Sequence, residues 1–331
     1  MSTVIIFIQK AIVQGMGILF GAEGEILTEK SGNLNLGIPG IMYMGGIAGL
    51  MGAFFYEKGT ENPNAFVGML ISLICAFLCA MLGGLIYSIL TITLRANQNV
   101  TGLALTTFGT GFGNFFGGSI SKLAGGVGQI SVSTTASAYQ AKIPGLSKIP
   151  VIGSIFFSYG FLTYVALLLA ILLSFFLFRT RNGLNLRAVG ENPGTADAAG
   201  INVSKYKYLA TCIGAGIAGL GGLYFVMEYS GGTWTDNGFG DRGWLAVALV
   251  IFTTWKPLNG IWGAYLFGML YWLYQFLPNM LGVKVAGYVT DLVQMVPYVV
   301  TIIVLVVVSF RKKKENQPPE SLGLSYFREE R

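Results

Sequence analysis

The residues of this chain that could do chemistry are few and scattered. Histidine is absent from all 331 residues, which removes the commonest general base and metal ligand. Cys75 and Cys79 lie one helical turn apart in an apolar run, and Cys212 lies in another. Disulfide and metal roles stay open for them, but small buried hydrophobic side chains are the favoured interpretation. No Ser–His or Cys–His nucleophile pair exists, so we expect a protein that is not an enzyme.

Nucleotide-binding motifs are missing or misplaced. No G-x-x-x-x-G-K-[ST] occurs, so the chain is not expected to hydrolyse ATP itself, and no cofactor is expected on it. GAGIAG at 214–219 formally matches the dinucleotide fingerprint, but it lies inside an apolar run rather than after a strand. Gly214, Ala218 and Gly222 are spaced four apart, as are Gly45 and Gly49, which predicts close helix–helix packing instead.

A polar segment from Arg179 to Ala210 separates two long apolar runs. Its basic residues are Arg179, Arg181, Arg187, Lys205 and Lys207. A short helix is predicted in its middle, because Asn192 is a good N-cap, Pro193 suits the first helical position and Gly200 suits the stop. A small helix held at a membrane surface by basic flanks is what a membrane subunit would offer a cytoplasmic partner.

Composition places the chain in a membrane. It is 53% hydrophobic and 11% charged, whereas soluble domains carry about 25% charged residues. We expect an all-α, polytopic bundle of about nine spans over residues 1–310, followed by a polar tail over 311–331. The expected spans are Val4–Phe20, Ile38–Phe55, Ala65–Leu94, Val100–Ile120, Ile155–Phe178, Tyr208–Tyr229, Gly243–Trp255, Gly260–Leu277 and Tyr288–Phe310. Val100–Ile120 is rich in Gly, Thr and Asn and Gly243–Trp255 is short, so some helices are expected to be discontinuous.

Basic residues predict the orientation. Arg95, Arg179–Lys207, Lys256 and Arg311–Lys314 fall on one side if the spans alternate, so that side is expected to be cytoplasmic. The C-terminus then lies inside the cell, in a bacterial cytoplasmic membrane, and Ser121–Ile149 forms the largest external loop. The net charge of +6 is read as orienting charge beside lipid rather than as a nucleic-acid surface. The tail is expected to be loosely ordered.

Uncharged polar and aromatic residues are the candidates for a translocation path. The second polar segment, Gly21–Gly40, is either a cytoplasmic loop or re-enters the membrane at Ser31–Gly40 and presents Asn33 and Asn35 to a cavity. Asparagine suits a neutral, hydroxyl-rich solute. The other candidates are Asn99, Asn114, Trp234 and Trp244. The tryptophans, with Phe239, could stack on a base, although anchoring at the membrane interface is the favoured interpretation. Acidic residues within these spans are scarce, which counts against a proton-coupled carrier.

Two segments together resemble one family. EKSGNLNLGIPGIMYMGGIAG (29–49) resembles the opening signature of the membrane permeases of ATP-binding-cassette importers for nucleosides and simple sugars. LRAVGENPGTADAAGINVSKYKYLA (186–210) resembles the cytoplasmic coupling loop of the same group, which is related to the branched-chain amino acid and ribose permeases. DRGWLAVALVIFTTWKPLNGIWGAYLFG (241–268) also resembles it. One departure is Pro39, where many relatives have an acidic residue.

The resemblance implies an importer for nucleosides or, second, simple sugars. It would hold two permease subunits, two ATPase subunits that bind ATP and Mg²⁺, and an external solute-binding lipoprotein. The second permease is expected to be a diverged homologue. The coupling helix maps onto Glu191–Ile201, where small alanines would fit a groove on the ATPase. The implied contact residues are Arg187, Glu191, Asn192, Pro193, Ala196, Ala199, Gly200 and Ile201. A branched-chain amino acid permease and an ion-coupled carrier or channel remain alternatives.

Overall fold

The computed structural model describes residues 3–123, 130–149, 152–281, 287–311 and 316–328. Within them the chain is helical, apart from one isolated bridge between Ser131 and Thr233, so the predicted all-α class is confirmed. The longer helices are α1 (Thr3–Glu29), α2 (Ile38–Gly59), α3 (Ala65–Ser88), α4 (Gln98–Leu123), α7 (Phe161–Arg179), α10 (Val203–Tyr224), α12 (Pro257–Leu281) and α14 (Val296–Arg311). The shorter ones are α5 (Ser133–Tyr139), α6 (Ile152–Phe156), α8 (Arg181–Glu191), α9 (Pro193–Ala198), α11 (Arg242–Phe252) and α13 (Gly287–Gln294), with π-helical turns η1 (Ile89–Thr93) and η3 (Phe225–Tyr229) and the 3-10 turn η2 (Leu146–Lys148).

Six helical stretches in the described part of the chain are long and apolar enough to cross a membrane. They are Val4–Glu29, Ile38–Gly59, Ala65–Thr93, Phe161–Arg179, Val203–Tyr229 and Gly287–Val307. The helices α4 and α12 reach 26 and 25 residues but are not among these six. With 11 residues, α11 spans about 16 Å, well short of the roughly 30 Å of a bilayer core. The expected count of about nine spans is therefore not confirmed.

The first helix is longer than predicted. We expected a span ending at Phe20 and a loop from Gly21 onward, but α1 continues to Glu29. The glycines that suggest a loop are instead sites of close helix contact. A Cβ added at Gly21 would lie 2.7 Å from the Cβ of Ala246, and one at Gly24 would overlap the carbonyl oxygen of Gly214. The polar segment between α1 and α2 therefore shrinks to residues 30–37.

The two segments predicted to be interrupted behave differently. Despite its glycines, α4 is continuous, so the expected break is wrong; Gly109 instead allows the backbone of Gly40 to approach. The shortness of α11 is confirmed. This helix ends at Phe252, and Thr254 and Trp255 follow with φ angles of 54° and 56°. Positive φ is strained for residues other than glycine, so the chain turns sharply there.

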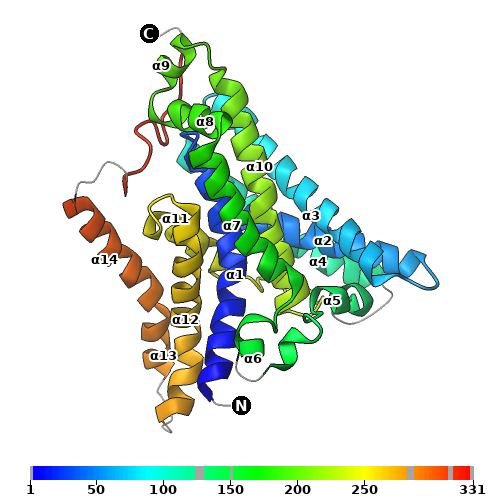
Figure 1. Ribbon diagram of the computed structural model, residues 1–331. Helices are drawn as coiled ribbons and strands as arrows, with labels where there is room; N and C mark the ends of the chain where they lie inside the picture. The colour runs from blue at the N-terminus through cyan, green and yellow to red at the C-terminus, as the bar shows by residue number, and fades with distance from the viewer. Residues whose placement is uncertain (1–2, 124–129, 150–151, 282–286, 312–315, 329–331) are drawn as a thin grey trace.

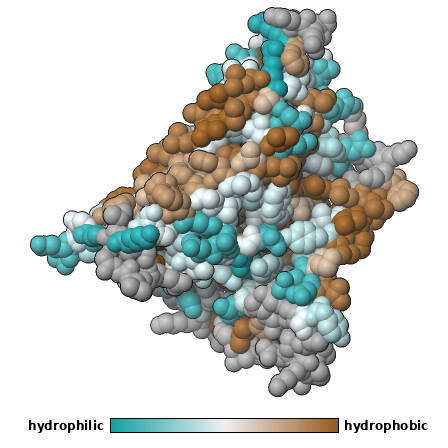
Figure 2. All heavy atoms as spheres, turned by 180° about the vertical axis from the view of Figure 1, so that it is seen from behind, coloured by the Kyte–Doolittle hydropathy of each residue, from teal (hydrophilic) through white to brown (hydrophobic). Residues whose placement is uncertain are grey.

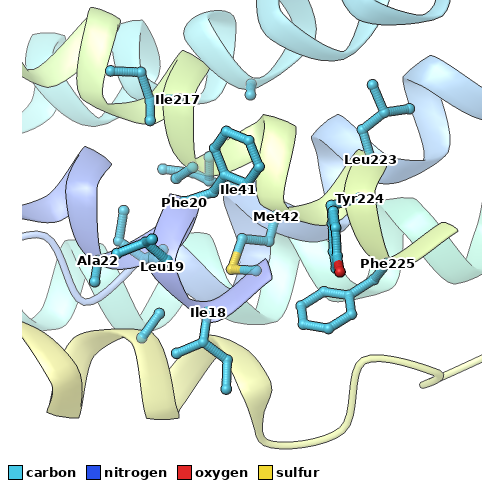
Figure 3. Close-up of a cluster of buried hydrophobic side chains, with 14 of the residues drawn as sticks. Ile18, Leu19, Phe20, Ala22, Ile41, Met42, Ile217, Leu223, Tyr224 and Phe225 are labelled. Carbon is cyan, nitrogen blue, oxygen red and sulfur yellow. The ribbon is translucent and has the colours of Figure 1, made fainter. Parts of the chain in front are cut away.

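The core of the molecule is the crossing of α1, α2 and α10. Figure 3 shows side chains from these helices and from η3 meeting in one cluster, including Phe20, Met42 and Tyr224. Small residues bring the backbones together, as sequence spacing predicted: a Cβ added at Gly45 would lie 2.5 Å from the Cα of Gly219. The formal dinucleotide fingerprint is thus a packing face within α10.

The surface divides into an apolar zone and polar ends. Figure 2 shows hydrophobic residues gathered below a hydrophilic tip, which Figure 1 identifies as the region of α9. Along α3, side chains such as Phe66, Ile74 and Leu82 are exposed, as suits contact with lipid or another membrane subunit. We call the tip that carries α8, α9 and residues 316–328 the α9 end.

The C-terminal tail differs from its expected loose order. Residues 316–328 lie against α8 and α9, and the side chains of Pro319 and Ser321 are buried. Hydrogen bonds from Ser321 to Gly190 and from Gly323 to Gly32 hold this segment in place. Of the basic run predicted to follow the last span, Arg311 ends α14, and residues 312–314 lie outside the described residues.

Candidate coupling and translocation sites

The predicted short helix is present, with the predicted ends. The Asn192 side chain accepts a hydrogen bond from the Thr195 amide at 2.9 Å, and Pro193 is the first residue of α9. At the other end, Gly200 takes a φ of 82° and its amide donates to the Asp197 carbonyl at 3.0 Å. An N-cap asparagine and a left-handed glycine satisfy the backbone groups that a helix of this length leaves free.

Ala196 and Ala199, which the sequence analysis gives the same role, differ in exposure. Ala199 and Gly200 are exposed, together with Asn192. Ala196 is only 3% exposed and packs into a small cluster with Val189 and Val203. The expectation that Ala196 settles into a partner's groove is therefore wrong, because its methyl group instead fixes α9 to its own subunit. Ile201 is half-buried beside the same cluster.

Arg187 and Glu191 lie on a separate helix, α8, that precedes α9. The Arg187 guanidinium stacks on the Phe178 ring at 5.1 Å, and Glu191 is exposed and accepts a hydrogen bond from the Glu320 amide at 3.4 Å. Lys30, which follows α1 and is 8% exposed, lies near both side chains. Burial lowers the pKa of the Lys30 ammonium; the nearby Glu191 carboxylate opposes this shift and Arg187 adds to it. Arg187 and Glu191 thus flank α9, as predicted from Pro193.

Residues 30–37 form a buried polar loop. The Asn33 amide donates to the Thr211 hydroxyl at 3.0 Å, and the Asn35 backbone amide donates to Glu25 at 2.8 Å. Both asparagine side chains are buried, at 1% and 0% exposure. The remaining atoms, the Asn33 carbonyl oxygen and the Asn35 amide nitrogen, have no hydrogen-bond partner among the described residues. Polar atoms left free in a buried site are available to a solute or water, and the role of these two residues in the path stays a prediction.

Buried carboxylates line α1, and the sequence interpretation missed them. Glu23, Glu25 and Glu29 are at most 2% exposed. Glu29 accepts a hydrogen bond from the indole of Trp255, whereas neither oxygen of Glu23 has a partner among the described residues. These three residues fall in Gly21–Gly40, the polar segment that we expected to join the first two spans. Acidic residues are therefore not scarce within the spans, contrary to the sequence-based expectation.

An aromatic cluster forms where α2 meets the segment between η3 and α11. The Tyr43 ring lies 4.4 Å from Phe239 and 6.1 Å from Trp234, measured between centroids. Trp234 is 5% exposed and fits against α4, where Gly113 and Gly117 leave room for the indole. Its Nε1 donates to Asp236 at 3.1 Å. Trp234 and Phe239 thus lie together and Tyr43 joins them, while their stacking on a base stays a prediction.

The other candidate path residues are spread over the molecule. Asn114 on α4 pairs with Asn237, whose backbone amide donates to the Asn114 carbonyl oxygen at 3.1 Å. Asn99 is exposed at the start of the same helix, 15 residues or about 22 Å away. Trp244 is half-buried on α11 and makes no ring contact with Tyr43, Trp234 or Phe239 among the described residues. A path through these residues would have to run the length of α4.

Arg242 anchors the loop that carries the aromatic cluster. Its guanidinium lies 5.1 Å from the Phe225 ring and 4.9 Å from the Tyr229 ring. It also donates to the carbonyls of Gly238 and Phe239 at 2.9 and 3.1 Å. A buried cation stacked on rings and bound to carbonyls ties residues 238–242 to η3.

We therefore expect Arg242→Met to lower the free energy of unfolding by about 2–3 kcal/mol, since it removes charge-assisted hydrogen bonds and leaves carbonyls unpaired. Thermal melting of the detergent-solubilised protein measures this loss. Lys142→Met, at an exposed position, is the control and should melt like the wild type. Equal melting temperatures for both variants would contradict the anchoring role.

The chain is similar to known permease proteins along most of its length. Residues 7–305 match the model of the family described as "Branched-chain amino acid transport system / permease component". The nucleoside ABC transporter permease protein NupC of Lactococcus lactis is 30% identical, over 92% of each chain. The guanosine ABC transporter permease protein NupQ of Bacillus subtilis is 31% identical, over 91% of each. A putative glucose ABC transporter permease protein of Haloferax volcanii, TsgC13, is 35% identical over 76% of this chain and 72% of its own.

No solved structure matches the chain. The family match begins within α1, ends within α14 and includes the buried loop, α9 and the aromatic cluster. This chain, with its apolar helices and its short capped helix between α8 and α10, belongs to the family of branched-chain amino acid transport system permease components.

Proposed function

We propose that this chain is the translocating subunit of an ATP-driven importer and that it takes up nucleosides. The observation that carries the proposal is similarity over nine-tenths of the chain to two permease proteins whose names give nucleosides and guanosine as solutes. The geometry of α9 supports the ATP-driven part, because a capped helix with exposed small residues suits the groove of a partner. The chain would then act with partners rather than as an enzyme.

The partners follow from this assignment. Two cassette ATPase subunits would bind ATP and Mg²⁺ and contact α9, and a second, diverged permease would complete the membrane part. An external lipoprotein would deliver the solute. The α9 end carries exposed Arg181, Arg179 and Lys205, which favours a cytoplasmic location for this end and for the C-terminus. The membrane would be the cytoplasmic membrane of a bacterium.

The solute path is proposed to run between the buried loop at 30–37 and the aromatic cluster. At the loop, the free amide atoms of Asn33 and Asn35 offer a donor and an acceptor, which a ribose or base can use. At the other side, Tyr43, Trp234 and Phe239 offer ring faces on which a base stacks. ATP binding to the partners would favour one of two states that open to opposite sides, which requires different affinities for the two states.

Uptake by reconstituted complexes tests the proposal. Proteoliposomes that hold this chain, its ATPase and permease partners and the binding protein should take up labelled guanosine or adenosine only when ATP is enclosed. Ribose, glucose and leucine are offered in parallel, because the family description names branched-chain amino acids and one relative is named for glucose. Leucine uptake without nucleoside uptake would mean that the solute is a branched-chain amino acid rather than a nucleoside. Uptake by this chain without any ATPase would overturn the importer assignment.

A further inference from the structure

The C-terminal segment Asn316–Arg328 crosses the α9 end and connects elements that are far apart in the sequence. Figure 1 shows it as the red coil that runs up to α9. Asn316 accepts a hydrogen bond from Lys256 at 2.9 Å, and the Ser321 and Gly323 amides donate to Gly190 and Gly32 at 3.1 and 3.2 Å. The segment therefore touches the turn before α12, the end of α8 and the buried loop before it reaches α9.

The segment ends on α9 itself. The Tyr326 hydroxyl donates to Asp197 Oδ2 at 2.9 Å, and Arg328 forms an ion pair with the same oxygen at 3.3 Å. The Tyr326 ring also packs beside the cluster of Val189, Ala196 and Val203. The position of α9 is thus set by the tail as well as by its own flanks.

A hollow of about 560 Å³ lies between α9 and this segment. Its walls include Arg95, Asp197, Gly200, Ile201, Tyr326 and Arg328. The lining is largely polar, which does not suit a lipid tail, and it shares Gly200 with the exposed end of α9. A partner that docks on that end of α9 would also cover the hollow.

Apolar side chains of the segment are exposed next to the hollow. Leu324 is 61% and Phe327 is 37% exposed, and the Arg95 guanidinium stacks on the Phe327 ring at 4.5 Å. These side chains stand at the polar end of the molecule, beyond the helices that suit a membrane. Arg328 already pairs with Asp197, so the three charged residues that line the hollow leave it a net charge of +1. Apolar residues beside a net positive charge are typical of a protein interface that receives an acidic partner.

We propose that the ATPase subunit docks on a composite surface made of α9 and the C-terminal segment, with an acidic side chain of the ATPase in the hollow between Arg95 and Arg328. This inference rests on the proposed function and adds to it a second contact element. Leu324 and Phe327 form the apolar part of the contact. The hydrogen bond from Tyr326 to Asp197 holds the segment on α9.

A photo-reactive phenylalanine analogue placed at single positions tests the contact in the intact complex. From position 324 it should cross-link to the ATPase, as it should from position 199 on α9. Cross-links from 199 but not from 324 would overturn the composite surface and leave the proposed function standing. Absence of ATPase cross-links from both positions would contradict the proposed function itself.

Substitution provides an independent measurement. We expect Leu324→Ser combined with Phe327→Ser to weaken ATPase association by about tenfold, the loss typical of truncating anchor side chains at an interface. Leu184→Ser is the matched control, since Leu184 is 57% exposed on α8 and does not line the hollow. Equal retention of the ATPase by the double variant and the control, in complexes that elute as single species, would overturn the proposal.

Discussion

An Ala199→Trp variant should insert and fold like the wild type but lose ATP-driven uptake, by at least about tenfold. Ala199 is exposed just past the end of α9, so an indole there meets little of its own subunit. Exposed substitutions of this kind usually change the free energy of unfolding by less than about 0.5 kcal/mol. Against a partner, however, the indole replaces a methyl group in a close contact and holds the two surfaces apart.

Two variants separate this effect from others. Ala141→Trp introduces the same side chain at an exposed alanine outside the α9 end and should leave uptake unchanged. Ala196→Leu acts within the subunit, since Ala196 fills the small cluster with Val189 and Val203; overpacking there should cost about 1–3 kcal/mol and lower the melting temperature. Normal ATPase stimulation and uptake by Ala199→Trp would show that α9 is not the coupling helix.

Local signals predicted the short helix well because its ends are determined within a few residues. Asn192, Pro193 and Gly200 each act on neighbouring backbone groups, and all three appear where their chemistry requires. What those signals could not show is which side of α9 faces its own subunit. That depends on Val189, Val203 and Tyr326, which reach the helix from α8, α10 and the tail.

The end of the first helix was a larger error. In a soluble protein Gly21 and Gly24 would favour a loop, but between membrane helices the same residues allow close packing. Ending the first span at Phe20, where the polar segment begins, shortened α1 and placed Glu23, Glu25 and Glu29 outside that span. The absence of proline and of any turn motif between Phe20 and Glu29 is the signal that could have corrected this.

The tail was misjudged for a related reason. Its composition is polar and includes Pro318-Pro319, which favours disorder when taken alone. Its order comes from long-range hydrogen bonds to Gly32 and Gly190 and from the hydrogen bond that Tyr326 donates to Asp197. Such contacts have no local signature, so they become visible only when the fold brings α8, α9 and the buried loop together.

The strongest expected effect on folding comes from one glycine of α10. A Cβ added at Gly222 would overlap the carbonyl oxygen of Met42 on α2, and the nitrogen of Gly46 would lie 3.0 Å away. Backbone atoms cannot move aside as a flexible side chain does, so α2 and α10 must separate. That separation opens the cluster in Figure 3, to which Met42, Leu223 and Tyr224 belong. We expect Gly222→Ala to destabilise the protein by more than the roughly 1–3 kcal/mol of ordinary overpacking.

Fluorescence-detected size-exclusion chromatography and thermal melting measure this effect. Gly222→Ala should lower the yield of the monodisperse peak severely, whereas Gly118→Ala should not, because a Cβ at Gly118 meets no atom within 4 Å. In α4 the added methyl group should even stabilise the helix, by up to about 1 kcal/mol, since alanine has the higher helix propensity. The same Gly→Ala substitution is therefore expected to destabilise the protein at position 222 and to stabilise it at position 118. Wild-type-like melting of Gly222→Ala would mean that α2 and α10 do not cross at Met42, and the buried loop that precedes α2 would then have to be placed anew.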